Sequence, residues 1–173
     1  MNNYRIKRSK SLTLCCGLTL CCVVLVAASL SGQTDTTQVP YPDGYRNWAH
    51  VKTALIQEGS PAFEHWGGFH HIYGNAKAME GYKAGKFDDG SILVFDVLEA
   101  VSKDSVINEG KRRLIDVMVR DSQIFKTTGG WGYEEFAGDS KRDRRIGALS
   151  VTSCYNCHAY QKTNDNVFSS LRN

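Results

Sequence analysis

The residues with the clearest chemical potential stand near the C-terminus, in the run Cys154-Tyr155-Asn156-Cys157-His158. Two thiols about one helical turn apart can add to the two vinyl groups of a haem, and the adjacent imidazole can then ligate the iron. The other chemistries open to a Cys-x-x-Cys pair are a disulfide, a thioredoxin-like redox site and half of a zinc site. A thioredoxin-like pair normally follows an early strand, whereas this pair lies in the last 20 residues of the chain.

The first 31 residues have the layout of an export signal. A basic stretch from Arg5 to Lys10 precedes an apolar stretch from Leu12 to Ala28, and a cut after Ser29 or Ser31 would leave small residues where a signal peptidase reads them. A permanent membrane anchor is the alternative, because the apolar stretch approaches the length of a spanning helix. We expect a signal peptide over residues 1–31, a flexible leader over 32–40 and one periplasmic domain over 41–173.

Removal of the signal would change both the charge and the cysteine count. Four of the 21 Lys and Arg residues lie in it, which leaves 17 against 18 Asp and Glu, so a nucleic-acid partner has no electrostatic support. Four of the six cysteines also lie in it, so no second pair could complete a zinc site. The sequence thus predicts one covalent haem c, held by Cys154 and Cys157, with His158 as the iron ligand.

The residue types available for a second axial ligand are few. An electron-carrying cytochrome usually fills that position with Met or His, but neither follows His158 in the chain. Upstream, none of the candidates stands in a recognisable ligand loop; they are His50, His65, His70, His71, Met79 and Met118. We therefore expect five-coordinate iron with an open position.

The elements that must position this motif are expected to be mainly strands. β-branched and aromatic residues predict strands over Phe69–Tyr73, Ser91–Leu98, Leu114–Val119 and Gly129–Phe136. Helix-like spacing predicts a first helix over Tyr45–Ile56, and Asn75 and Gly85 are suited to begin and end a second one. The fold class predicted is mainly β (α+β): an antiparallel sheet with a few short helices and a haem-attachment helix near the C-terminus.

Several short segments, in their order and spacing, resemble the cytochrome P-460 family over most of residues 41–170. They are Tyr41-Pro42-x-Gly44-Tyr45-Arg46-x-Trp48, His71-Ile72-Tyr73, Gly85-Lys86-Phe87-x-Asp89-Gly90-Ser91, Gly130-Trp131-Gly132 and the late Cys-x-x-Cys-His. The resemblance implies a mainly β fold, commonly a homodimer, with one five-coordinate haem c. The family includes hydroxylamine-oxidising enzymes and c-prime-beta cytochromes, which bind nitric oxide without that activity.

The resemblance also marks positions around the haem. In the enzymatic branch a lysine cross-links to the macrocycle, and the matching residue here is Phe95, so the chain resembles the c-prime-beta branch. His70 matches a basic family residue near the haem and Asp121 matches an acidic one. Leu149 matches a pocket-lining position where an ionisable group would favour proton transfer, which a leucine cannot perform.

These observations lead to three functional hypotheses. The first is an exported mono-haem cytochrome that binds nitric oxide or a similar small ligand. The second is a haem-dependent oxidoreductase that oxidises hydroxylamine or nitric oxide. The third is an electron-transfer cytochrome, which would need a sixth ligand and a redox partner protein.

Overall fold

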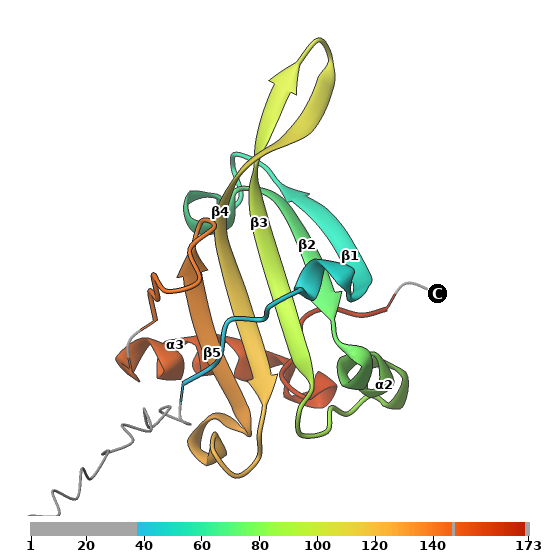
Figure 1. Ribbon diagram of the computed structural model, residues 1–173, viewed down its shortest axis with the longest axis vertical. Coiled ribbons are helices and arrows are strands. Elements are labelled where there is room, and N and C mark those ends of the chain that lie inside the picture. The colour runs from blue at the N-terminus through green and yellow to red at the C-terminus, as the bar shows by residue number, and fades with distance from the viewer. Residues whose placement is uncertain (1–37, 147, 172–173) are drawn as a thin grey trace, which may run out of the picture. The chain divides into compact units, whose positions relative to one another are not determined.

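The computed structural model describes residues 38–146 and 148–171, and of residues 148–151 it describes the backbone alone. These residues form a five-stranded antiparallel sheet in which each strand pairs with the next along the chain (Figure 1). The strands are β1 (Ala49–Ile56), β2 (Gly68–Gly74), β3 (Ile92–Lys103), β4 (Val106–Arg120) and β5 (Trp131–Ala137). The predicted fold class is confirmed. The predicted signal peptide lies outside the described residues, and none of the helices described is long and apolar enough to cross a membrane.

Short helices connect and flank the strands. The α-helices are α1 (Phe63–Trp66), α2 (Ala76–Ala84) and α3 (Ala148–His158), and the 3₁₀ turns are η1 (Tyr45–Asn47), η2 (Lys126–Thr128) and η3 (Ala159–Asn164). The predicted caps of α2 are confirmed: the Asn75 side chain accepts a hydrogen bond from the Ala78 N–H, and Gly85 has a left-handed φ of 72°. Glycine adopts that conformation without the steric cost of a Cβ.

Two apolar clusters cover opposite faces of the sheet, because successive side chains of a strand alternate between faces. The N-terminal face packs against residues 39–48, and its buried cluster is Val39, Tyr45, Val94, Ile115, Val117 and Phe136. The helical face packs against α2 and α3, and its buried cluster is Ala78, Phe87, Leu93, Trp131, Tyr133 and Val167. In Figure 1, α3 and the N-terminal segment cross the sheet on these two different sides.

The predicted first helix is wrong. Only Tyr45–Asn47 forms a 3₁₀ turn, and Ala49–Ile56 is strand β1, paired antiparallel with β2. Val51, Thr53 and Ile56 are β-branched, and their preference for strands prevails once β2 supplies a partner edge. The helix-like spacing of Trp48, Val51 and Leu55 was too short a pattern to distinguish the two.

Two segments extend beyond their expected limits. β3 and β4 continue well past the predicted strands as a hairpin that projects from the sheet (Figure 1). Val39, within the segment expected to be a flexible leader, is buried at 3% exposure in the N-terminal face cluster. Its carbonyl accepts a hydrogen bond from Arg144, which lies in the segment between β5 and α3.

Candidate functional site

Helix α3 carries the Cys-x-x-Cys-His motif across the helical face of the sheet, and His158 is its last residue. Cys154 is partly buried and packs against the apolar cluster of that face, together with Tyr155. Cys157, three residues further on, is exposed. Residues three apart lie on one side of a helix, so the two sulfurs lie along the same side of α3.

The imidazole of His158 is held by a main-chain carbonyl. Its Nδ1 lies 2.8 Å from the oxygen of Asn166, and because a carbonyl can only accept, Nδ1 carries the proton. The Nε2 lone pair is then free, which is the arrangement of a metal-binding histidine with its second nitrogen fixed by a neighbouring group. Burial lowers the pKa of His158, which favours the same neutral imidazole.

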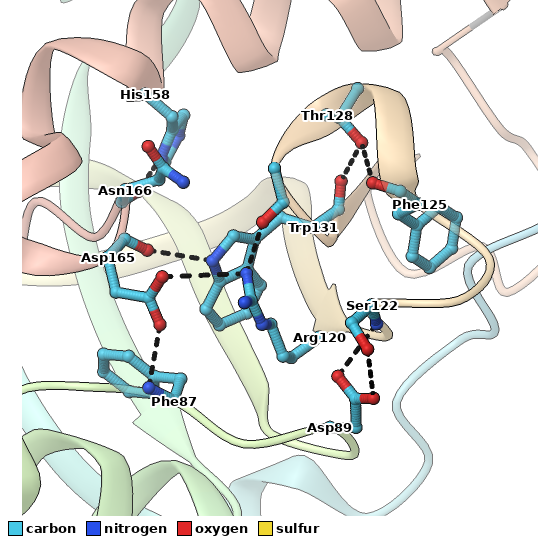
Figure 2. Close-up of polar contacts among 11 residues, drawn as sticks. Phe87, Asp89, Arg120, Ser122, Phe125, Thr128, Trp131, His158, Asp165 and Asn166 are labelled. Carbon is cyan, nitrogen blue, oxygen red and sulfur yellow. Dashed lines mark hydrogen bonds and ion pairs between the residues drawn. The ribbon is translucent and has the colours of Figure 1, made fainter.

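The Asn166 carbonyl is itself placed by the turn that follows η3 (Figure 2). Asp165 and Asn166 have positive φ values of 49° and 64°. The Asp165 carboxylate accepts from the Phe87 N–H at 2.8 Å, and its main-chain oxygen accepts from the Trp131 indole N–H at 2.8 Å. Arg120 lies 3.6 Å from the same carboxylate. The turn that orients His158 is therefore tied to three other segments of the fold.

The environment of the cysteines distinguishes haem attachment from a thioredoxin-like site, a disulfide and a zinc site. Burial, helped by the negative fields of Asp116 and Glu135, raises the pKa of Cys154 to about 11, whereas a thioredoxin-like site needs a lowered one. Both thiols are unpaired, and no cluster of three or more His, Cys, Asp or Glu residues suited to a metal occurs in the described part of the chain. Two free thiols and a neutral imidazole with a free Nε2 fit the attachment of haem c.

One cross-strand row crosses the whole helical face of the sheet. Its members are direct partners in consecutive strands: Lys52, Ile72, Phe95, Asp116 and Glu135. Phe95 stands in the middle of this row and is partly buried. The row therefore places an aromatic ring at the centre of the face that bears α3, with a lysine at one end and two carboxyl groups toward the other.

His70 stacks on the Phe95 ring, with ring centroids 4.4 Å apart and an angle of 22° between the planes. The His70 Nδ1 is buried and has no hydrogen-bond partner. Burial, with smaller contributions from His71 and Lys52, lowers the pKa of His70. The structure thus brings together two residues predicted from the sequence, on the face that carries α3.

A hydrogen-bonded acid pair lies beside Phe95. The Trp66 indole donates to Asp116 at 2.7 Å, and Asp116 is hydrogen-bonded to Glu135. Glu135 in turn lies 2.7 Å from Nε2 of His65. Burial and the neighbouring Glu135 raise the pKa of Asp116 to about 8.

The remaining predicted positions lie elsewhere. Asp121 caps a local turn, accepting hydrogen bonds from the Gln123 and Ile124 N–H groups at 2.9 Å, so Asp116 is the acidic neighbour of Phe95 instead. Leu149 belongs to α3, but the structure describes only its backbone and not its side chain.

Of the candidate axial ligands, His50 and His71 are joined through Thr53, and His71 belongs to the N-terminal face. Sequence reasoning missed Asp116, Glu135 and Asn166. The sequence did hold a signal for Asp116: the alternation of Leu114–Val119 places Asp116 on the other face of the strand from Ile115 and Val117.

A Cys-x-x-Cys-His motif on a helix, with the Nε2 of its histidine free, is the attachment site of a c-type haem protein. A comparison with family models agrees, because the model described as cytochrome P460 matches residues 42–169. The chain belongs to the cytochrome P460 family, whose members are haem c cytochromes. A comparison with curated proteins gives no match.

Proposed function

We propose that this protein is an exported cytochrome with a single covalent haem c, whose five-coordinate iron binds nitric oxide or a similar small ligand. The observation that carries the proposal is the geometry of His158, whose Nδ1 is committed to Asn166 while Nε2 is left for a metal. Cys154 and Cys157 would hold the haem through thioether bonds, and His158 would be the proximal ligand. When bound, haem supplies an iron site that can take up diatomic ligands and exchange one electron.

The residues on the sheet support an open distal position. Phe95 has no atom able to ligate iron, and His70 is stacked flat on its ring. Met118 packs into the helical face cluster, and the Met79 sulfur of α2 lies close to Gly74, the last residue of β2. His65 is engaged by Glu135. Among the described residues upstream of α3, each of these side chains has a packing contact or a hydrogen bond, and His70 also has a buried Nδ1 without a hydrogen-bond partner.

The second candidate is an oxidoreductase that acts on hydroxylamine or nitric oxide. The acid pair Asp116 and Glu135 favours it, because substrate oxidation releases protons that a nearby base must accept. Phe95 at the position of the cross-linking lysine weighs against it. An electron-transfer role is third, since it requires a sixth ligand. We further propose a periplasmic location, a homodimer and, for either redox role, a partner protein.

The test is an intact mass and absorption spectrum of protein produced in a host with haem c maturation. We expect the mass of the chain plus one haem, and a five-coordinate ferrous spectrum that changes on addition of nitric oxide or carbon monoxide. Turnover of hydroxylamine with an electron acceptor, at a rate above that of free haem, would favour the enzyme instead. A six-coordinate ferrous spectrum that ignores both ligands would favour the electron carrier.

A further inference from the structure

The acid pair beside Phe95 is connected to solvent on one side. Glu135 has a side-chain exposure of 7%, whereas the side chain of His65, 2.7 Å from it, is 51% exposed. Helix α1 presents both His65 and Trp66 because Arg113 of β4 donates hydrogen bonds to the carbonyls of Glu64 and Gly67 at its end. A hydrogen-bonded path therefore runs from Asp116 through Glu135 and His65 to the surface.

The same pair lies on the sheet face that would hold the cofactor. Asp116 is the direct cross-strand partner of Phe95, on the face that carries α3. Both carboxyl groups also act electrostatically on the sulfur of Cys154, whose pKa they help to raise. A charge change at a haem attached to Cys154 would be felt by the pair through the same low-dielectric surroundings.

We propose that Asp116 and Glu135 form a proton-binding pair coupled to the haem iron, and that His65 connects this pair to solvent. On reduction the iron(III) would gain one electron from an external reductant, and the pair would gain one proton from water. No covalent bond of the haem changes, and the net charge of the site is conserved. This inference rests on haem attachment to α3, and it is independent of which small ligand the iron binds.

The groups around the pair define what else could titrate. Helix α1 contributes Glu64 and His65, β1 contributes Lys52 at the far end of the row, and β2 contributes His70. Phe95 of β3 is uncharged, and Cys154 of α3 would be a thioether in the haem protein. Haem propionates also titrate, so a variant of the pair is required to separate them from Asp116 and Glu135.

The experiment measures the midpoint potential of the haem protein between about pH 5 and 9 by spectroelectrochemistry. The wild-type potential should fall with rising pH, by up to about 59 mV per tenfold change in proton concentration for one proton per electron. Asp116→Asn and Glu135→Gln should each flatten this slope. Glu64→Gln is the control, because it changes an exposed acid to an amide in α1, next to His65, and this variant should keep the wild-type slope. Redox-difference infrared spectra should show a protonated carboxyl band on reduction, which Asp116→Asn removes.

A wild-type potential that does not change with pH would overturn the inference, and so would a wild-type slope retained by both Asp116→Asn and Glu135→Gln. The absorption spectrum and carbon monoxide binding of the same samples keep the two proposals apart. A protein that binds carbon monoxide but has a pH-independent potential contradicts the inference alone. A protein without attached haem contradicts the proposed function.

Discussion

Phe95 and Asp116 face each other directly across β3 and β4. Phe95, which the family resemblance matches to the cross-linking lysine of the enzymatic branch, therefore has a carboxyl group on one side and the ring of His70 stacked on the other. The sequence indicated a pocket that includes the apolar side chains of Phe95 and Leu149. The structure adds polar groups to it, because Trp66 directs its indole N–H at Asp116.

The first prediction concerns the two cysteines. Cys154→Ala and Cys157→Ala should each leave at most one thioether bond, and the double variant should release all its haem into acidified organic solvent, because both thiols are needed for the normal attachment. Asn156→Ala, an exposed change between the cysteines, should retain covalent haem. Complete extraction of haem from the denatured wild type would show that the attachment is not covalent.

The second prediction is the absence of a lysine–haem cross-link. Phe95 has no nucleophile, and the lysine of the same cross-strand row, Lys52, is separated from it by Ile72 of β2. Mass spectrometry of tryptic peptides should find haem on the peptide of Cys154 and Cys157 alone. Haem on a second peptide containing Lys52 would contradict the prediction and would raise the standing of the oxidoreductase hypothesis.

The sequence predicted the central strands and α2 because their signals are local. Asn75 and Gly85 determine the ends of α2 by themselves, and the alternation of Ile115, Val117 and Val119 assigns one face of β4. β1 could not be assigned in this way, because its short apolar pattern suits either structure until β2 pairs with it. The length of the projecting hairpin was equally hidden, since residues 99–111 are mostly exposed and carry little apolar periodicity.

The candidate site likewise contains residues that the local sequence reveals and residues that only the folded structure reveals. Cys154, Cys157 and His158 can be recognised from their spacing in the chain. The hydrogen-bond partner of His158 is the main-chain carbonyl of Asn166, which a left-handed turn places. Every residue has such a carbonyl, so the residue type at position 166 could not reveal this contact. Glu135 pairs with Asp116 only through the register of β4 and β5, which the sequence does not state.

The third prediction concerns a buried charge on the N-terminal face. Asp96 is fully buried; Tyr45 donates its hydroxyl to it at 2.6 Å and Arg112 its Nε at 2.7 Å. Tyr45→Phe should lower the free energy of unfolding by about 1.5–3 kcal/mol, the range for a hydrogen bond to a charged group. Urea denaturation of the wild type and the variant measures the difference. Tyr73→Phe removes a hydroxyl from the neighbouring, less buried ring and should cost less; equal losses would argue against a special role for Asp96.

The fourth prediction follows from the raised pKa of Asp116. Between its unfolded value near 4 and its folded value of about 8, the folded state holds a proton that the unfolded state has lost. This contribution to stability is thus fully present below pH 4 and is lost as the pH rises through 8. Urea denaturation at several pH values should show a steeper fall with rising pH for the wild type than for Asp116→Asn. Parallel curves would mean that Asp116 ionises normally in the folded protein, and Glu64→Gln should follow the wild type.

The last prediction tests whether Phe95 lines the ligand pocket. Phe95→Ala should speed the entry of carbon monoxide, because removal of the ring opens space in the middle of the face that carries α3. Phe95 is only partly buried, so the stability cost should fall below the roughly 3–5 kcal/mol of a fully buried phenylalanine. Phe69→Ala is the matched control, since Phe69 is also partly buried but stacks on His71, on the N-terminal face. Stopped-flow mixing of carbon monoxide with the ferrous proteins should give a faster association rate for Phe95→Ala alone. Equal rates in all three proteins would place Phe95 outside the pocket and remove the main structural support for a ligand-binding role.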